Sequence, residues 1–429
     1  MGRKYNKQKC SEDRESEEKR AISNKSTSRT VINHVRRCCA QKREDSSLLR
    51  QLQAKIKISG PITVADYMKE VLTNPAAGYY MHQDVFGSQG DFITSPEISQ
   101  IFGELIGVWC VNEWMQIGSP SKFQLVELGP GRGTLTDDIL RVFSKFPLKD
   151  AVSAHLVEVS PTLSDMQKVK LQGGETGGES EQTTSSFSYK HCLSKHGCRV
   201  SWYQQLQDVP RGPSVFIAHE FFDALPVHKF QKTDQRWNEI LVDLDPNSDG
   251  LRYVLSKRQT LAAKTLLKVK RDDPRDHIEV CPEAGILMQE LSTRIAEDGG
   301  FALLADYGHS GEKGDTFRAF REHKLHDPLN EPGSADLTAD VDFSYLKEMA
   351  GQKVSSYGPI TQDQFLYHMG IGARLQVLLG SATPSQRKDL ISGYDMLTNH
   401  SKMGERFKFM ALMQNDRKDY IPAGFENHS

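Results

Sequence analysis

The 429-residue sequence predicts an α/β protein with a mostly parallel, seven-stranded core sheet. Two observations carry this prediction. From residue 116 onward, short apolar runs alternate with amphipathic helical segments, which is typical of a parallel sheet covered on both faces. One of these runs ends in a glycine-rich loop, as strands do beside a ligand in open α/β sheets. An inserted β-rich subdomain and an N-terminal helical region are expected in addition.

Composition limits the class of protein further. Hydrophobic residues make up 38% and charged residues 26%, and the formal net charge is −2. This balance does not indicate a nucleic-acid partner. No apolar run reaches the length of about 18 residues that an integral membrane segment needs, so none is expected. The seven cysteines form no C-x-x-C pair, so neither a disulfide framework nor a metal site is expected.

Residues 1–47 differ from the rest of the chain. They are rich in lysine and arginine and poor in large apolar side chains. Such a segment buries too little apolar surface to order itself, so a disordered tail is one interpretation. A mitochondrial targeting segment is the other, although the acidic cluster at residues 12–18 is atypical of one.

The helical region is expected over residues 48–115. Residues 64–72 have helical spacing, with Thr63 at the cap position, and residues 98–115 form a longer helical pattern. Pro96 is expected to open a helix.

The first part of the core spans residues 116–226. Strands are expected at 124–130, 154–160, 199–206 and 214–220, and helices at 135–143 and 161–170. Residues 173–186 are expected to form a polar surface loop.

The insert is expected over residues 227–300. Residues 240–244 and 251–255 alternate apolar and polar side chains around a turn at 245–250, which predicts a hairpin. We expect the insert to roof the carboxyl edge of the sheet, where ligands bind. The second part of the core spans 301–415, with strands at 301–308, 353–360 and 406–413, and residues 416–429 form a tail.

The glycine-rich loop reads V-E-L-G-P-G-R-G-T-L over residues 126–135. Gly129, Gly131 and Gly133 let the chain turn sharply and let a cofactor approach the backbone. In the nicotinamide fingerprint the third glycine comes five positions after the first, whereas here it comes four positions after. Glu127 would repel a pyrophosphate but suits a cationic amino group. We therefore predict an S-adenosylmethionine site, with a dinucleotide site as the alternative.

Two more acids come at the ends of the second and third expected strands. Glu158 ends the second strand, where a carboxylate accepts hydrogen bonds from the ribose hydroxyls of either cofactor. Asp208 follows the third strand and is expected to reach the adenine amino group.

The fourth strand runs into HEFFDALPVH over residues 219–228. Glu220 and Asp223 would orient a guanidinium beside the cofactor, and one of them would accept its proton. They are therefore the candidate catalytic residues. The alternative is a helix start that Asp223 caps. His219 and His228 have no metal-ligand spacing and are interpreted as structural.

Three aspartates occur close together in ADLTADVDFSYL over residues 335–346: Asp336, Asp340 and Asp342. Each either caps a helix or lines an acidic groove for an arginine-bearing peptide.

Five separated blocks, in the same order, closely resemble the MidA family of mitochondrial protein arginine methyltransferases that assist assembly of respiratory complex I. The blocks are GPITVADYMKEVLTNPAAGYY, GDFITSPEISQIFGELIGVW, LVELGPGRGTL, HEFFDALPVHKFQ and DLTADVDFSYL. The resemblance covers about residues 48–415. It implies a class I, Rossmann-like methyltransferase fold, S-adenosylmethionine as methyl donor and a mitochondrial matrix location. It also implies symmetric dimethylation of an arginine in a core complex I subunit.

The resemblance also assigns residues. The three loop glycines and Glu158 carry over as cofactor contacts by motif position. Glu220 and Asp223 carry over less directly, because their loop does not match the paired-glutamate loop of other arginine methyltransferases. Residues 1–47 do not resemble a family targeting sequence.

Two other functions are compatible with the sequence. One is an assembly factor that keeps the methyltransferase fold and holds a partner subunit without catalysis. The other is a nicotinamide oxidoreductase, which the glycine spacing disfavours. A homo-oligomer is also compatible with the sequence.

Overall fold

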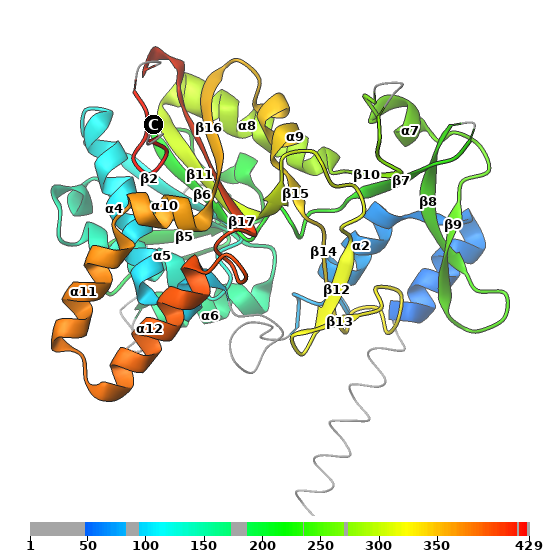
Figure 1. The fold of residues 1–429 in the computed structure, drawn as a ribbon, viewed down its shortest axis with the longest axis horizontal. Coiled ribbons are helices and arrows are strands. Elements are labelled where there is room, and N and C mark those ends of the chain that lie inside the picture. The colour runs from blue at the N-terminus through cyan, green and yellow to red at the C-terminus, as the bar shows by residue number, and fades with distance from the viewer. Residues whose placement is uncertain are drawn as a thin grey trace, which may run out of the picture.

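A computed structural model describes residues 48–82, 94–172, 187–234, 236–269, 273–417 and 420–426. The predicted tail at 1–47 and the predicted polar loop at 173–186 lie outside these residues. Figure 1 shows a larger lobe around a long sheet and a smaller β-rich lobe beside it.

Among the described residues, the main sheet has nine strands and is mixed. Its order is β16-β17-β11-β6-β2-β3-β5-β4, and β15 pairs with β11. All seven expected strands are present, as β2 (Phe123–Leu128), β3 (Val152–Val157), β5 (Arg199–Tyr203), β6 (Ser214–His219), β11 (Gly300–His309), β16 (Val354–Thr361) and β17 (Phe407–Gln414). The expectation of seven strands was too low, because it missed β4 (Lys190–Leu193) and β15 (Val341–Asp342).

The central strands are parallel and the edges are not. β5, β3, β2, β6 and β11 run parallel to one another. β17 is antiparallel to both β11 and β16, and β4 is antiparallel to β5. The carboxyl ends of the parallel strands therefore meet at one edge, where ligands bind in sheets of this kind.

Helices cover both faces of the main sheet. The described helices of the larger lobe are α3 (Ser95–Ile98), α4 (Gln100–Gln116), α5 (Thr134–Phe143), α6 (Pro161–Gln172), α8 (Pro282–Asp298), α9 (Phe343–Ala350), α10 (Gln362–His368), α11 (Ile371–Ser381) and α12 (Pro384–Thr398). Short 3₁₀ turns occur at Pro147–Asp150, Leu206–Asp208 and Asn415–Arg417.

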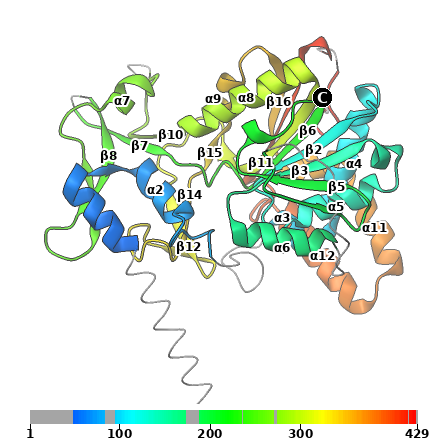
Figure 2. The ribbon, with the colours of Figure 1, turned by 180° about the vertical axis from the view of Figure 1, so that it is seen from behind.

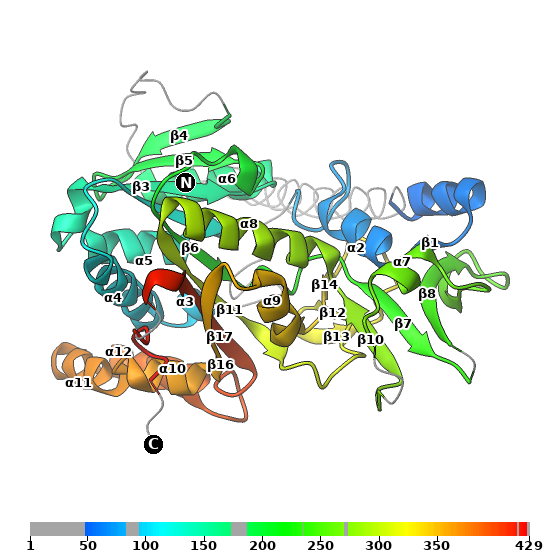
Figure 3. The same cartoon turned by 90° about the horizontal axis from the view of Figure 1, so that it is seen from above.

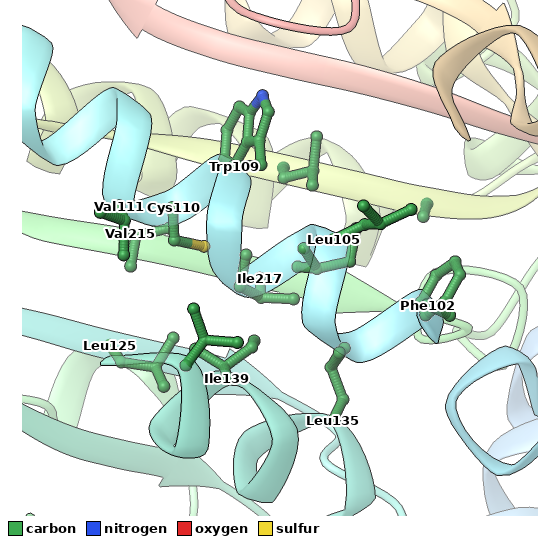
Figure 4. Close-up of a cluster of buried hydrophobic side chains, with 14 of the residues drawn as sticks. Phe102, Leu105, Trp109, Cys110, Val111, Leu125, Leu135, Ile139, Val215 and Ile217 are labelled. Carbon is green, nitrogen blue, oxygen red and sulfur yellow. The ribbon is translucent and has the colours of Figure 1, made fainter. Parts of the chain in front are cut away.

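The strand side chains divide cleanly between these two faces. On β6, Val215 and Ile217 pack with α4 and α5, whereas Phe216 and Ala218 pack with α8 and α9. This alternation is what a pleated strand with both faces buried requires. Figure 4 shows the first cluster, with Trp109 of α4 lying over the sheet.

A second sheet forms the smaller lobe. It contains β1 (Ile62–Thr63), β7 (His228–Lys232), β8 (Trp237–Leu244), β9 (Leu251–Leu255) and β10 (His277–Val280), and all its described pairings are antiparallel. The predicted hairpin is confirmed, with Leu244 of β8 opposite Leu251 of β9. The helical residues 48–59 and α2 (Val64–Thr73) pack on this sheet, and Thr63 caps α2 by accepting the Asp66 N–H.

Four elements, α8 and three later strands, lie differently from the expected insert at 227–300. The helix α8 belongs to the main sheet by packing, since Met288, Leu291 and Ile295 are buried there with β6 and β11. Figure 3 shows α8 lying along the main sheet. We therefore propose that the insert ends near residue 281, before α8.

Outside the expected range, β12 (Arg318–Arg321), β13 (Lys324–His326) and β14 (Asp336–Thr338) form a third sheet between the lobes. Figure 2 shows β12 and β14 beside α2. The smaller lobe also carries α7 (Leu261–Thr265). Among the described residues, no helix combines the length and the apolar character needed to cross a membrane.

Candidate functional site

A cavity of about 1900 Å³ opens at the carboxyl edge of the parallel strands. Its walls come from both lobes and from the sheet between them. The main sheet contributes loops after β2, β3, β6 and β11, and α2 and the β12–β14 sheet contribute the opposite side. This volume is larger than the roughly 300–1,000 Å³ of common small-molecule sites, so it has room for a cofactor and a substrate side chain together.

The glycine loop lies on the wall of this cavity. Gly129, Gly131 and Gly133 have φ angles of +63°, +53° and +78°, a left-handed conformation that disfavours residues with a β-carbon. Gly129 and Gly131 line the cavity, whereas Gly133 is set back against Gln167. A β-carbon at Gly129 would lie 2.7 Å from Cδ2 of Phe221. The loop thus presents bare backbone to the cavity, as the prediction required.

Glu158 lines the cavity at the end of β3, as expected. Its two carboxylate oxygens accept hydrogen bonds from the backbone N–H of Ser160 at 2.7 Å and from Nε2 of Gln167 at 3.0 Å. Gln167 also donates to the Gly131 carbonyl at 2.7 Å. Burial raises the pKa of Glu158 to about 7. This network fixes the carboxylate beside the loop, where it fits the ribose of a nucleoside.

Glu127 is set back from the cavity wall. Its buried carboxylate accepts a hydrogen bond from the Thr136 hydroxyl at the start of α5, and it is not among the cavity-lining residues. Burial raises the pKa of Glu127 to about 7. In this arrangement Glu127 ties the loop to α5.

Asp208 also lies off the cavity wall. Its neighbours Leu206 and Gln207 line the cavity, but Asp208 does not. The loop's cation, Arg132, is likewise not a lining residue and pairs with Glu97 at 3.5 Å. In the described residues no group of three or more His, Cys, Asp or Glu side chains is arranged to hold a metal ion.

Glu220 lies on the cavity wall directly after β6. Its φ is +49°, and its Oε1 is 3.4 Å from the backbone nitrogen of Ser95, which donates to it. Burial, followed by the nearby carboxylate of Asp223, raises the pKa of Glu220 well above its ordinary value. His219 packs beneath it, between Phe102 and Phe407, and burial lowers its pKa to about 3.

Asp223 shares the same wall. Its carboxylate accepts a hydrogen bond from the Thr338 hydroxyl at 2.9 Å. Burial raises its pKa to about 6, and the positive charge of Arg318 opposes that rise. No helix starts at Asp223, so the alternative interpretation as a helix cap is wrong.

The three aspartates of residues 335–346 divide between the two expected roles. Asp342 caps α9, where it accepts the N–H groups of Ser344 and Tyr345. Asp336 and Asp340 line the cavity. Sequence reasoning missed their partners, which come from distant segments of the chain.

The partners of Asp336 and Asp340 differ in charge. Tyr80 donates to Asp336 at 2.6 Å. Arg318 and Lys313 pair with Asp340 at 2.7 and 2.8 Å. Because two cations already neutralise Asp340, the acidic character of the wall rests mainly on Glu220, Asp223 and Asp336.

This arrangement can hold a cation beside a nucleoside. The glycine loop and Glu158 suit a nucleoside without requiring a phosphate partner. A carboxylate pair stands on the neighbouring strand and would pair with a cationic side chain entering from the other lobe. A guanidinium is the best match, because its fork of N–H donors bonds two acceptors at once.

Comparison with known proteins defines the class. Residues 105–360, more than half of the chain, match the family described as "Putative S-adenosyl-L-methionine-dependent methyltransferase". The chain therefore belongs to this methyltransferase family. A Burkholderia thailandensis protein solved with bound S-adenosyl-homocysteine shares the fold, with a TM-score of 0.72 over 90% of this chain and 95% of that one, at 23% identity.

More similar relatives carry a particular name. The chain is 58% identical over 383 residues to a Mus musculus protein, covering 88% of this chain and 87% of that one. It is 55% identical over 387 residues to a Danio rerio protein, covering 89% and 90%. Both relatives are named protein arginine methyltransferase NDUFAF7, mitochondrial.

Proposed function

We propose that this protein methylates an arginine side chain of another protein, with S-adenosylmethionine as the methyl donor. The observation that carries the proposal is the pair Glu220 and Asp223 on the cavity wall next to the glycine loop. Membership in the methyltransferase family supplies the donor, and the names of the relatives support arginine as the acceptor.

Bound S-adenosylmethionine would supply an electrophilic methyl group on sulfur. Gly129 and Gly131 would admit it against the backbone, and Glu158 would accept hydrogen bonds from its ribose. We propose a supporting role for Glu127, which would hold the loop through Thr136, and for Gly133, whose left-handed backbone leads into α5. Asp208 is the weakest of the cofactor assignments, because only its neighbours line the cavity.

The carboxylates would position the acceptor. Glu220 and Asp223 would bond to the guanidinium and keep one of its nitrogens aligned with the methyl group. In the transfer, the methyl–sulfur bond breaks, a methyl–nitrogen bond forms and sulfur leaves as a thioether. The methylated nitrogen then gives up one proton, which an ionised carboxylate of the pair accepts.

The proposed substrate and compartment rest on the resemblance to the same family. We propose that the acceptor is an arginine in a core subunit of respiratory complex I, dimethylated symmetrically during assembly in the mitochondrial matrix. The similarity to relatives named as mitochondrial supports the compartment. The size of the cavity supports a protein acceptor, because it leaves space beyond a nucleoside.

The test is methyl transfer from labelled S-adenosylmethionine to purified complex I core subunits, with wild type, Glu220→Gln and Asp223→Asn. Removing a catalytic acid–base group lowers kcat by about 10²–10⁴-fold, so each variant should fall in that range. Glu283→Gln is the matched control, because Glu283 lines the same cavity but pairs with Lys69 on its exposed rim. Its rate should match wild type.

Two other outcomes contradict the proposal. Equal rates for all four proteins would show that the carboxylate pair does not serve transfer. Cofactor binding without transfer by wild type, together with retention of a complex I subunit, would favour the non-catalytic assembly factor.

A further inference from the structure

The buried carboxylate of Asp306 lies behind the loop that carries Glu220 and Asp223. Asp306 is on β11, one residue beyond Ala305, the last β11 residue paired with β6. Only 1% of Asp306 is exposed. Glu220 and Asp223 line the cavity, whereas Asp306 does not. A ligand in the cavity would therefore meet the loop, and Asp306 would act on it only through the loop.

One oxygen of Asp306 accepts three consecutive backbone N–H groups. Its Oδ2 accepts from Phe221 at 3.1 Å, from Phe222 at 2.9 Å and from Asp223 at 3.2 Å. Its Oδ1 accepts the N–H of Tyr307 at 2.8 Å. Successive N–H groups that converge on one point form a concave anion site, and here a side chain of the same protein occupies it.

The loop is bonded at both ends as well. At its start, the N–H of Glu220 donates to the Ala305 carbonyl at 2.9 Å. At its end, the N–H of Ala339 donates to the Asp223 carbonyl at 3.0 Å. Between these two points, the hydrogen bonds to Asp306 fix the loop. Without Asp306, the N–H groups of residues 221–223 would lose the acceptor that the structure gives them.

The conformation of the loop needs this hold. Glu220 has a φ of +49°, which a residue with a β-carbon adopts only when its surroundings enforce it. With the N–H groups turned toward Asp306, the side chains of Glu220 and Asp223 are left to face the cavity. Burial and the nearby carboxylates of Asp223 and Glu220 raise the pKa of Asp306, and the loop N–H groups oppose that rise by favouring the ionised form.

We propose that Asp306 is a positioning residue for methyl transfer: its carboxylate gathers the N–H groups of residues 221–223 and so holds Glu220 and Asp223 in the geometry that receives the guanidinium. This inference rests on the proposed function. It also predicts a property of the loop that can be measured without any substrate.

The test compares Asp306→Ala with Asp306→Asn in the full chain. Alanine removes every acceptor. Asparagine keeps one oxygen for the loop but turns its NH₂ toward the Tyr307 N–H. Glu113→Ala is the control, since Glu113 is also a buried acid that accepts a backbone N–H, from Ala423 at 3.1 Å, but lies away from the cavity lining.

Amide hydrogen exchange in a peptide covering residues 219–226 directly reports how firmly Asp306 holds the loop N–H groups. Asp306→Ala should speed exchange there by at least about tenfold, with Asp306→Asn near wild type. Misplacement of a reacting group by about 1 Å lowers the reaction rate by about 100-fold, so kcat for Asp306→Ala should fall by about that factor. The Kd for S-adenosylmethionine should stay within about threefold of wild type, and asparagine should restore most of kcat.

The outcomes separate this inference from the proposed function. If amide exchange in residues 219–226 is unchanged in Asp306→Ala, Asp306 does not hold the loop, whatever the activity. Faster exchange with wild-type kcat overturns the positioning role. If the wild-type protein binds the cofactor but transfers no methyl group, the proposed function is wrong. The exchange experiment would still show whether Asp306 holds the loop. If Asp306→Ala does not fold, Asp306→Asn decides: an exchange rate and kcat both near wild type support the proposal, and fast exchange with intact kcat overturns it.

Discussion

Replacing Gly129 with alanine should destabilise the protein and weaken cofactor binding. The φ of +63° at this position costs a residue with a β-carbon about 1–2 kcal/mol. The added β-carbon would lie 2.7 Å from Cδ2 of Phe221, and overpacking of this kind costs about 1–3 kcal/mol. The free energy of unfolding should therefore fall by about 2–5 kcal/mol.

Gly118 provides a matched control for the backbone cost. Its φ is +87°, and an added β-carbon would have no neighbour within 4 Å. Gly118→Ala should therefore lose only about 1–2 kcal/mol. The difference between the two variants isolates the contact between position 129 and Phe221.

Urea unfolding measures the two stabilities, and calorimetric titration with S-adenosylmethionine measures the cofactor Kd. Phe221 and Gly129 both line the cavity, so displacing the ring should raise the Kd by about tenfold or more, or about 1.4 kcal/mol. Gly118→Ala should bind like wild type. Equal stability losses for both variants, with unchanged Kd, would refute the reasoning that the close approach to Phe221 requires glycine.

Three further predictions concern the core, the cavity wall and pH. Trp109→Ala should lower the free energy of unfolding in urea by about 3–5 kcal/mol, because the side chain is fully buried; a loss below 1 kcal/mol would contradict that packing. Tyr80→Phe removes the hydrogen bond to Asp336 and should lower the free energy of unfolding, measured thermally, by about 1–3 kcal/mol. It should also raise the KM for the protein substrate; an unchanged KM would show that this pair does not contact the substrate. The pKa of Asp223 is raised to about 6, and that of Glu220 is raised well above its ordinary value. An arginine peptide should therefore bind weakly at pH 5 and more tightly as the pH rises and these groups ionise. Calorimetry that shows constant affinity from pH 5 to pH 8 would contradict this.

Most of the main sheet could be predicted because each core strand carries its own local signal. Strands buried on both faces are short apolar runs, and the seven that the sequence shows are all present. The missed strands lack such a run. β4 alternates half-buried and exposed residues at the edge of the sheet, and β15 is only two residues long.

Long-range packing explains the elements that the sequence placed differently. The spacing of α8 marks an amphipathic helix but does not say which sheet its apolar face covers. β1 pairs with β8, about 180 residues away along the chain, and no local pattern encodes that partner. The β12–β14 sheet is likewise held by contacts with distant segments such as α2.

The candidate site was partly predictable for a topological reason. Gly129, Glu158 and Glu220 follow neighbouring parallel strands, so their chain positions bring them to one edge of the sheet. Glu127 points elsewhere because side chains alternate along β2: Leu125 packs in the α4–α5 cluster, and Glu127 shares its face. That alternation was readable in the sequence.

Asp306 was harder to find. It stands at the end of the apolar run FALLADYG and reads as an ordinary strand end. The available signal was an acid near the carboxyl end of an expected strand. Its role depends on three backbone N–H groups of another segment, which no pattern of side chains records.

The most direct test of the account identifies the atom that receives the methyl group. The full chain is incubated with S-adenosylmethionine and complex I core subunits, and the products are digested and sequenced by mass spectrometry. We expect methyl groups on the terminal guanidinium nitrogens of an arginine, with Glu220→Gln lowering their yield by about 10²–10⁴-fold. Methylation confined to lysine, to a carboxylate or to a small molecule would contradict the assignment of Glu220 and Asp223 as a guanidinium site.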